Sequence, residues 1–498
     1  MKNKLAINTI TSLAYQIIAI ICSFILPRLI IISYGTELNG LVNSINQFLS
    51  VITFLELGVG AVIQSALYKP LAEKNNDLIS KIMVSGTKFF NHIALILVAY
   101  IGILVIIYPI VVNKNYEWLF TATLIISMSI SLFAQYYFGV VDRLLLTADQ
   151  MGYIQYIAQI ITLVLNTLIC VILIRWKVSI HVVKLTTSMI YVLRPVFLRL
   201  YVIKHYNINR KAKYSVEPIA QKWNGMAQHI SAVVLTGTDT IILTIFSSLQ
   251  NVSIYSVYYM VISGLKVMFT SLNSGFHALI GKLWAKKDIT NLNYVFGIME
   301  WFIHTCVVFV FGCTFVLLIP FVQVYTVGIK DANYLQNNFS IIITLAYAIN
   351  ALSIPYHAMI LVAGNYKQTQ TKFIFTAIIN IVISILAVYY LNLIGVAIGT
   401  LVAMIYQFIW MTLYVSKNIN YWPLKNVIKQ LVIDIISIII GVVLASIFHL
   451  NNETYLSWIV LAIKVVIVFG MIIVLINSIL CKNKVKLFIK YITNKQLG

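Results

Sequence analysis

The stretch NTITSLAYQIIAIICSFILPRLIIIS (residues 8–33) decides the fold class, because it is long and apolar enough to cross a bilayer as a helix. About 20 helical residues span the ~30 Å hydrocarbon core. Thirteen similar runs follow, at about 39–66, 87–112, 117–142, 153–174, 179–203, 223–248, 252–281, 294–322, 333–363, 368–391, 394–416, 426–449 and 455–481. The sequence therefore predicts an all-α polytopic membrane protein with about 14 transmembrane helices.

The composition supports the same conclusion over the whole chain. Of the 498 residues, 61% are hydrophobic and only 10% are charged, whereas soluble domains are about 45–50% apolar and about 25% charged. The five cysteines lie inside or at the ends of apolar runs, and no HExxH or CxxC spacing occurs. We therefore expect no metal site, no disulfide and no resident cofactor.

The basic residues predict the orientation of the chain. Of the 35 Lys and Arg residues, 26 fall in segments on the side of the two termini and only 4 in segments on the other side. By the positive-inside rule, both termini are expected in the cytoplasm. The net charge of +21 then faces anionic inner-leaflet lipid. Nucleic acid is not an expected partner, because the bases are scattered over many short loops.

A weak internal repeat divides the chain into two lobes. At a shift of 213 residues, LYKPLAEKNNDLI (67–79) aligns with IGKLWAKKDITNL (280–292), so that Lys69 meets Lys282 and Lys74 meets Lys287. We expect two parallel, pseudo-symmetric six-helix lobes at 1–206 and 223–417, joined by a cytoplasmic loop at 207–222. The segment 418–498 adds two C-terminal helices and a basic tail. Parallel halves with a substrate path between them are a transporter architecture.

Several segments carry a resemblance to a known family. They are LPRLIIISYGTELNGLVNSINQFLSVITFLELGVGAVIQSALYKPLAEKN (26–75), LLLTADQMGYIQ (144–155), GTDTIIL (237–243), SIYSVYYMVISGL (253–265) and GVAIGTLVAMIYQFIWMTLY (395–414). Together they resemble the polysaccharide repeat-unit flippases, the Wzx-like branch of the MOP exporter superfamily. The resemblance implies two six-helix lobes around a central cavity that alternates between inward-open and outward-open states.

The resemblance also implies a function. A protein of this family moves an undecaprenyl-diphosphate-linked oligosaccharide to the outer leaflet of the membrane. The oligosaccharide then serves O-antigen or capsule synthesis, with the polysaccharide polymerase machinery as an expected partner. A peptidoglycan-precursor flippase and a MATE-type drug or cation antiporter are the alternatives. An enzyme is not expected, because every outer loop is short and no GxSxG, P-loop or paired acidic motif is present. The sugar and the oligomeric state stay open at this point.

Three bases within apolar runs are candidates for contacts with the diphosphate, namely Arg28, Arg194 and Lys266. Ionisable residues inside a membrane are costly and often functional, and the planar fork of arginine suits phosphate oxygens. Arg28 follows Pro27 and Arg194 precedes Pro195, and proline can bend a helix towards a cavity. The alternative is that both arginines snorkel to the nearer membrane surface.

Two acids, Glu56 and Asp239, are candidates for coupling to H⁺ or Na⁺, or for ion pairs in the cavity wall. The repeat places Lys266 at the depth of residue 53, one helical turn from Glu56, and Asp239 at the depth of residue 26, near Arg28. Buried structural ion pairs are the alternative. Asp434 and Lys464, outside the repeat, are each about nine residues into their runs from opposite sides, which predicts a structural ion pair.

Overall fold

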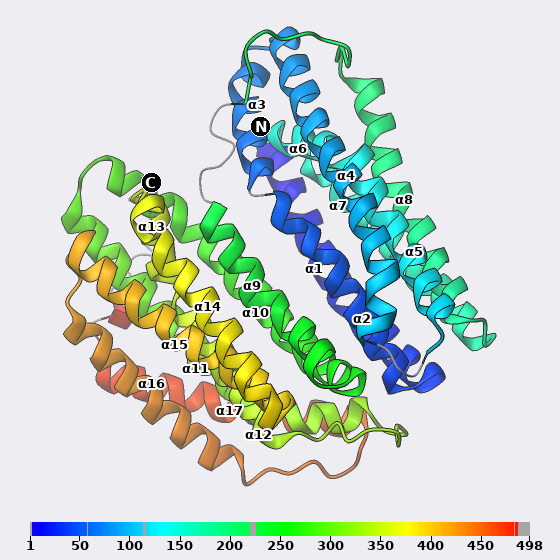
Figure 1. The fold of residues 1–498 in the computed structure, drawn as a ribbon. Helices are drawn as coiled ribbons and strands as arrows, with labels where there is room; N and C mark the ends of the chain where they lie inside the picture. The colour runs from blue at the N-terminus through cyan, green and yellow to red at the C-terminus, as the bar shows by residue number, and fades with distance from the viewer. Residues whose placement is uncertain (1, 57, 113–115, 220–225, 483, 487–498) are drawn as a thin grey trace. The chain divides into compact units, whose positions relative to one another are not determined.

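The computed structural model describes residues 2–56, 58–112, 116–219, 226–482 and 484–486 (Figure 1). Throughout these ranges the regular elements are helices. The contacts divide the chain into two compact units. Unit 1 comprises Met1–Val233 and Ser248–Ser253, and unit 2 comprises Val234–Ser247 and Ile254–Gly498. Each unit is described by itself, and the finer bounds of the predicted lobes stay a prediction.

Unit 1 contains eight α-helices, one 3₁₀ segment and one π-helical segment among its described residues. In chain order they are α1 (Lys2–Tyr34), α2 (Thr36–Ser50), the 3₁₀ segment η1 (Val51–Glu56), α3 (Val59–Ala72), α4 (Asn76–Val112), α5 (Trp118–Ala134), the π-helical segment η2 (Gln135–Gly139), α6 (Val140–Ala148), α7 (Gly152–Arg175) and α8 (Ile180–His205).

The remaining helices follow in the order of the predicted runs. They are α9 (Met226–Phe246), α10 (Leu249–Ala285), α11 (Ile289–Tyr325), α12 (Asn337–Leu352), α13 (Ile354–Val362), α14 (Tyr366–Leu391), α15 (Leu393–Asn418), α16 (Leu424–Ala445) and α17 (Tyr455–Leu480). Unit 2 takes α11 to α17 together with most of α10.

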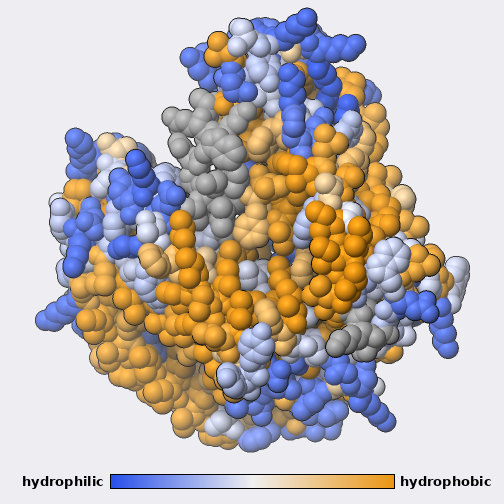
Figure 2. All heavy atoms as spheres, viewed as in Figure 1, coloured by the Kyte–Doolittle hydropathy of each residue, from blue (hydrophilic) through white to orange (hydrophobic). Residues whose placement is uncertain are grey.

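The helix lengths confirm a multi-pass membrane fold. Among the described residues, 12 helices are long and apolar enough to cross a membrane, and the bent pair Thr36–Glu56 and Val59–Ala72 makes up to 13. The remaining predicted run, 223–248, falls partly outside the described residues. On the face in Figure 2, hydrophobic residues cover the middle of the helices and hydrophilic residues gather at their ends. A bilayer selects this distribution, because its core cannot solvate polar groups.

Two helices of unit 1 are interrupted, and the interruptions are tied together. The first is the bend of 47° between η1 and α3, where Gly58 has a left-handed φ of 76° that glycine adopts without strain. The second is the π-helical η2, which separates α5 from α6. The hydroxyl of Tyr136 in η2 donates a hydrogen bond of 2.5 Å to Oε1 of Glu56 at the end of η1. The bond fixes one irregular segment against the other.

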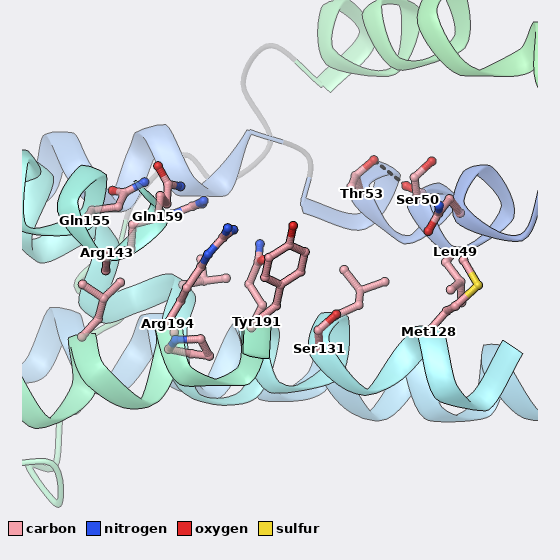
Figure 3. A pocket seen from close by; sticks show the side chains of 18 residues that line it. Leu49, Ser50, Thr53, Met128, Ser131, Arg143, Gln155, Gln159, Tyr191 and Arg194 are labelled. Carbon is pink, nitrogen blue, oxygen red and sulfur yellow. Dashed lines mark hydrogen bonds between the residues drawn. The ribbon is translucent and has the colours of Figure 1, made fainter. Parts of the chain in front are cut away.

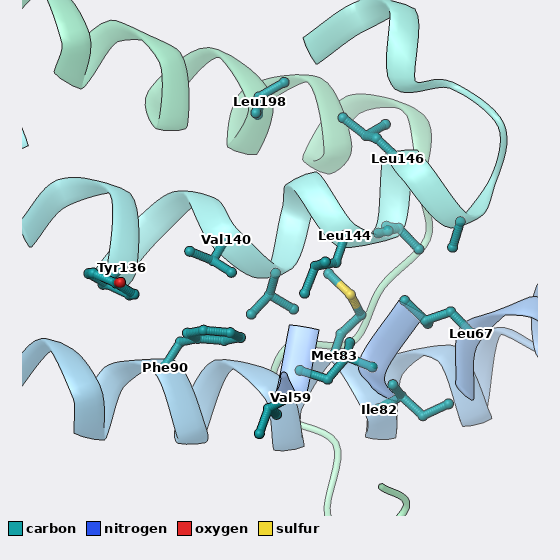
Figure 4. Close-up of a cluster of buried hydrophobic side chains, with 14 of the residues drawn as sticks. Val59, Leu67, Ile82, Met83, Phe90, Tyr136, Val140, Leu144, Leu146 and Leu198 are labelled. Atoms are coloured by element: carbon teal, nitrogen blue, oxygen red, sulfur yellow. The ribbon is translucent and has the colours of Figure 1, made fainter. Parts of the chain in front are cut away.

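Around these interruptions unit 1 has a closely packed apolar core (Figure 4). Val59 and Leu67 on α3, Phe90 on α4 and Leu145 on α6 are all fully buried. The rings of Phe90 and Tyr136 stack with their centroids 6.3 Å apart. This core holds η2 and α6 in place from the side of α3 and α4.

The first part of the predicted cytoplasmic loop, up to Ile219, packs on unit 1. Arg210 makes an ion pair of 2.9 Å with Asp142 on α6, and Glu217 accepts a hydrogen bond from Ser85 on α4. Lys88 lies over the ring of Tyr214 at 4.8 Å. Ile219 is only 2% exposed and joins the same apolar core. This segment therefore holds a fixed course along unit 1.

The C-terminal helices α16 and α17 pack against α11 in unit 2. Phe469 on α17 is fully buried and fits against two glycines, Gly312 on α11 and Gly441 on α16. A Cβ built on either glycine would lie 2.3 Å from Cε1 of Phe469. The three helices therefore meet at a point that only glycine can occupy without a shift of the ring.

We expect Gly441→Ala to lower the free energy of unfolding by about 1–3 kcal/mol, because the added methyl overpacks the buried Phe469 ring. Thermal unfolding of the purified protein in detergent measures this change. Gly470→Ala is the matched control, since a Cβ at Gly470 on α17 meets no atom within 4 Å. Equal melting temperatures for the two variants would contradict the packing argument.

Candidate functional site

A pocket with a volume of about 280 Å³ lies in unit 1 and is lined by apolar and polar side chains (Figure 3). It is enclosed by α2 and η1 on one wall, by α5, η2 and α6 on another, and by α7 and α8. Its polar lining residues are Asn46, Ser50, Thr53, Ser131, Gln135, Arg143, Gln155, Gln159, Tyr191 and Arg194. Concave sites of this size with a few convergent polar groups are typical small-ligand sites.

A second pocket of about 250 Å³ adjoins the first. The two share Asn46, Met128, Ser131 and Tyr191 as lining residues, so Tyr191 stands where they meet. The second pocket contains Lys184 and Asn166. We call the pocket with Arg143 and Arg194 the arginine pocket and the one with Lys184 the lysine pocket.

The charged residues that line the two pockets are all basic. Arg143 and Arg194 line the arginine pocket, Lys184 lines the lysine pocket, and no Asp or Glu lines either one. Within the described residues, none of these three bases makes an ion pair. A cationic group in a membrane-embedded unit is costly unless it is compensated. The pockets are therefore suited to an anion.

Arg194 is held in a defined orientation on α8. Its Nε donates to Oγ1 of Thr162 on α7, and its guanidinium lies over the ring of Tyr191 at 4.3 Å. Figure 3 shows the Arg194 side chain extending from α8 towards the side of the pocket that carries Gln159. An arginine fixed at Nε presents its terminal nitrogens as a planar donor edge, which suits a phosphate group.

Arg143 reaches the arginine pocket because of the π-helical segment before it. The wider turn over Gln135–Gly139 inserts a residue and rotates the start of α6 relative to α5. Asp142, which is 1% exposed, then pairs with Arg210 of the linker, while Arg143 lines the pocket. Adjacent residues on one helix thus serve two different contacts.

The structure does not place Arg28 in either pocket. Leu26 and Ile30, one turn apart on α1, line the lysine pocket. Arg28 lies two residues from each, on the other side of the helix, and is half-buried. Glu56 also lies outside the described pocket linings, and its carboxylate accepts the hydrogen bond from Tyr136. A role for either residue in transport stays a prediction.

Asp239 on α9 lies in a buried polar network of unit 2. Its carboxylate is 2% exposed and accepts hydrogen bonds from the Tyr255 hydroxyl at 2.9 Å and from Oγ1 of Thr400 at 2.8 and 3.0 Å. Asn380 on α14 donates in turn to Thr400 at 3.0 Å. All of these partners are neutral, and no described Lys, Arg or His pairs with Asp239.

Lys266 lies on α10 of unit 2 and is half-buried. No ion pair joins it to another residue in the part of the chain that the structure describes. The predicted pairings of Lys266 with Glu56 and of Asp239 with Arg28 join different units, so they stay predictions.

The predicted pair of Asp434 and Lys464 is wrong. Asp434 on α16 instead contacts His304 on α11, with 2.5 Å between Oδ2 and Nδ1, and Gln430 donates to its other oxygen at 3.1 Å. Lys464 is exposed on α17 and lies over the ring of Phe448 at 5.4 Å. The two residues had been matched by depth, but depth does not fix the direction in which each helix presents its side chain.

Sequence reasoning found Arg194 and missed the groups beside it. Arg143 directly follows the apolar run 117–142, a position that predicts a cytoplasmic flanking base and not a pocket residue. Lys184 lies within the run 179–203, where the sequence alone gives it no role. The spacing along α8 could have identified Lys184, because Tyr191 and Arg194 follow it by about two and three helical turns and so share its face of the helix.

Comparison with known proteins gives the fold. No protein-family model and no curated protein matches the sequence. Among solved structures, the lipid II flippase MurJ in an inward closed conformation matches with a TM-score of 0.69 and 15% identity, over 93% of this chain and 98% of that chain. An inward-facing multidrug resistance MATE transporter of the MOP superfamily matches with a TM-score of 0.59 and 15% identity, over 82% and 98%.

A mutant of the Vibrio cholerae MATE transporter VcmN matches with a TM-score of 0.56 and 13% identity, over 84% of this chain and 100% of that chain. At such identities the likeness concerns the fold alone. It confirms the predicted all-α polytopic class, and the chain shares its fold with these solved structures.

Proposed function

We propose that this protein is a transporter that moves an undecaprenyl-diphosphate-linked oligosaccharide from the inner to the outer leaflet of the bacterial cytoplasmic membrane. The transport would proceed by alternating access and serve surface polysaccharide synthesis. The observation that carries the proposal is the arginine pocket, in which Arg143 and Arg194 face a cavity that no carboxylate lines.

The sign of this charge discriminates between the two kinds of transporter that share the fold. A cationic drug in the arginine pocket would meet two guanidinium groups and no compensating acid, which is unfavourable at low dielectric. A diphosphate would instead form charge-assisted hydrogen bonds with both arginines. The pocket therefore favours an anionic, lipid-linked substrate over the substrate of a drug or cation antiporter.

A peptidoglycan lipid precursor is the second candidate substrate. The neighbour with a TM-score of 0.69 is named as a lipid II flippase, which supports a lipid-linked substrate of one kind or another. The charge of the arginine pocket suits either lipid-linked glycan.

Asp239 is the proposed coupling group for H⁺ or Na⁺. Its carboxylate is buried among neutral donors and lacks a basic partner in the described residues. Such a group is at lowest energy when it carries a proton or a bound cation, because an uncompensated buried charge is costly. Binding of the ion would thus be linked to the position of α9 relative to Thr400 on α15.

Deletion of the gene distinguishes the candidate substrates. We expect loss of surface polysaccharide and accumulation of lipid-linked repeat units in the inner leaflet, measured by mass spectrometry of extracted lipids. Accumulation of lipid-linked peptidoglycan precursor, with normal surface polysaccharide, would support the second candidate. Normal levels of both, with altered drug resistance, would refute the proposal.

Arg194→Gln should reduce transport in complemented deletion cells by more than about tenfold, because a charged hydrogen bond to phosphate is worth about 1.5–3 kcal/mol. Arg194→Lys should recover part of the activity. The matched control is Arg199→Gln on the same helix, since Arg199 lies over Phe138 and outside the pocket lining. Equal losses in the two Gln variants, at equal protein levels, would show that the pocket is not the site.

Asp239→Asn should keep the fold and abolish the dependence of transport on the ion gradient. The amide retains size and part of the hydrogen-bonding pattern but cannot be charged or bind a proton near neutral pH. Transport in membrane vesicles with imposed pH or Na⁺ gradients measures the effect. Asp77→Asn is the control, because Asp77 is exposed and pairs with Lys81 at the start of α4. An Asp239→Asn variant that still responds to either gradient would exclude the coupling role.

A further inference from the structure

Four side-chain amides line the arginine pocket, and the charge argument does not use them. They are Asn46 on α2, Gln135 on η2, and Gln155 and Gln159 on α7. Within the described residues, no hydrogen bond is formed by the side chain of any of the four. Oε1 of Gln159 is fully buried and without a partner.

Unsatisfied amides inside a membrane-embedded unit need an explanation. A buried amide without a hydrogen bond costs about 1–3 kcal/mol by mutational measures, so a structural role would favour apolar side chains here. Other amides in unit 1 form hydrogen bonds, as when Asn39 donates to Ser253 at 2.7 Å and Asn166 to the Tyr191 hydroxyl at 3.3 Å. Of the four pocket amides, Asn46 and Gln135 are exposed and Gln155 and Gln159 are half-buried, and only Gln159 has a fully buried oxygen without a partner. The two half-buried glutamines are therefore the amides best suited to a partner that enters the pocket.

Gln155 and Gln159 lie beside Arg194 in the arginine pocket. Gln155 and Gln159 are four residues apart on α7, so they share one face with about 5–6 Å between their Cβ atoms. That face meets α8, which carries Tyr191 and Arg194, and Figure 3 shows both glutamines beside the Arg194 side chain. A group bound by Arg194 would have the two amides within reach of its next substituent.

Sugar hydroxyls are chemically suited to bind the two glutamine side chains. A primary amide offers both donors and acceptors, so two amides one turn apart can bond to neighbouring hydroxyls of one pyranose ring. The face of Tyr191 adds an aromatic surface of the kind on which a sugar ring can stack. No other charged group lines the space except the two arginines.

We propose that Gln155 and Gln159 recognise the first sugar of the substrate, next to a diphosphate held by Arg143 and Arg194. This inference rests on the proposed function. It assigns the discrimination between sugars to Gln155 and Gln159, and the affinity for the diphosphate to the two arginines. Loss of a sugar hydroxyl or of an amide would then leave buried polar groups unpaired, which is how a site rejects the wrong ligand.

Binding measurements on the full chain in nanodiscs test the inference. The probes are undecaprenyl diphosphate alone and the same lipid carrying glucose, galactose or N-acetylglucosamine. We expect wild-type protein to bind at least one glycosylated probe about tenfold more tightly than the bare diphosphate, as two neutral hydrogen bonds would give. The double variant Gln155→Leu/Gln159→Leu should lose this difference and keep its affinity for undecaprenyl diphosphate.

The controls separate the failure of the inference from that of the proposed function. Gln64→Leu is the matched control, because Gln64 on α3 contacts Tyr68 outside the pocket; it should behave as wild type. Gln159→Met alone serves if the double variant does not fold. Equal affinity of wild type for all four probes, or a sugar preference that survives both glutamine changes, would overturn the inference. Failure to bind undecaprenyl diphosphate at all would instead overturn the proposed function.

Discussion

The structure depends on one constraint, namely that a polar or charged group within a lipid-embedded helical unit must find a partner in the protein or in a ligand. Asp142 finds Arg210, Asp434 finds His304, and Glu56 finds Tyr136. Asp239 is surrounded by neutral donors. Three bases of unit 1, Arg143, Lys184 and Arg194, follow a different pattern, because they line two adjoining pockets and form no ion pair within the described residues.

The apolar packing gives this polar arrangement its rigidity. Val59, Phe90 and Leu145 hold the interrupted helices from one side, and the segment up to Ile219 packs on unit 1 through Ile219 and the Arg210–Asp142 ion pair. In unit 2, close contact at Gly312 and Gly441 joins α16 and α17 to α11. Side chains that must present a fixed geometry to a ligand need such support, since displacements of about 1 Å weaken directional contacts.

Hydropathy predicted most of the helices, because the length and polarity of a span are properties of one segment. The direction of a side chain also depends on how its helix is rotated against its neighbours, and the wrong prediction concerns this direction. The pair of Asp434 and Lys464 was predicted from depth alone, yet Asp434 contacts His304 and Lys464 is exposed on α17. Arg143 depends on a π-helical segment that no hydropathy pattern reveals. The partner of Asp434, His304, lies 130 residues away in sequence.

The π-helical segment Gln135–Gly139 also bears on how such a protein can change over generations. One residue more or less in a helix rotates everything after it by about 100°. Loss of a single codon in this segment would move Arg143 into the place of Asp142 and Leu144 into the place of Arg143, so the cavity wall would lose a base. Insertion of a codon would instead move Asp142 into the place of Arg143. A basic, a neutral and an acidic cavity wall are thus separated by one codon each, which offers a short evolutionary route between substrate classes on one fold.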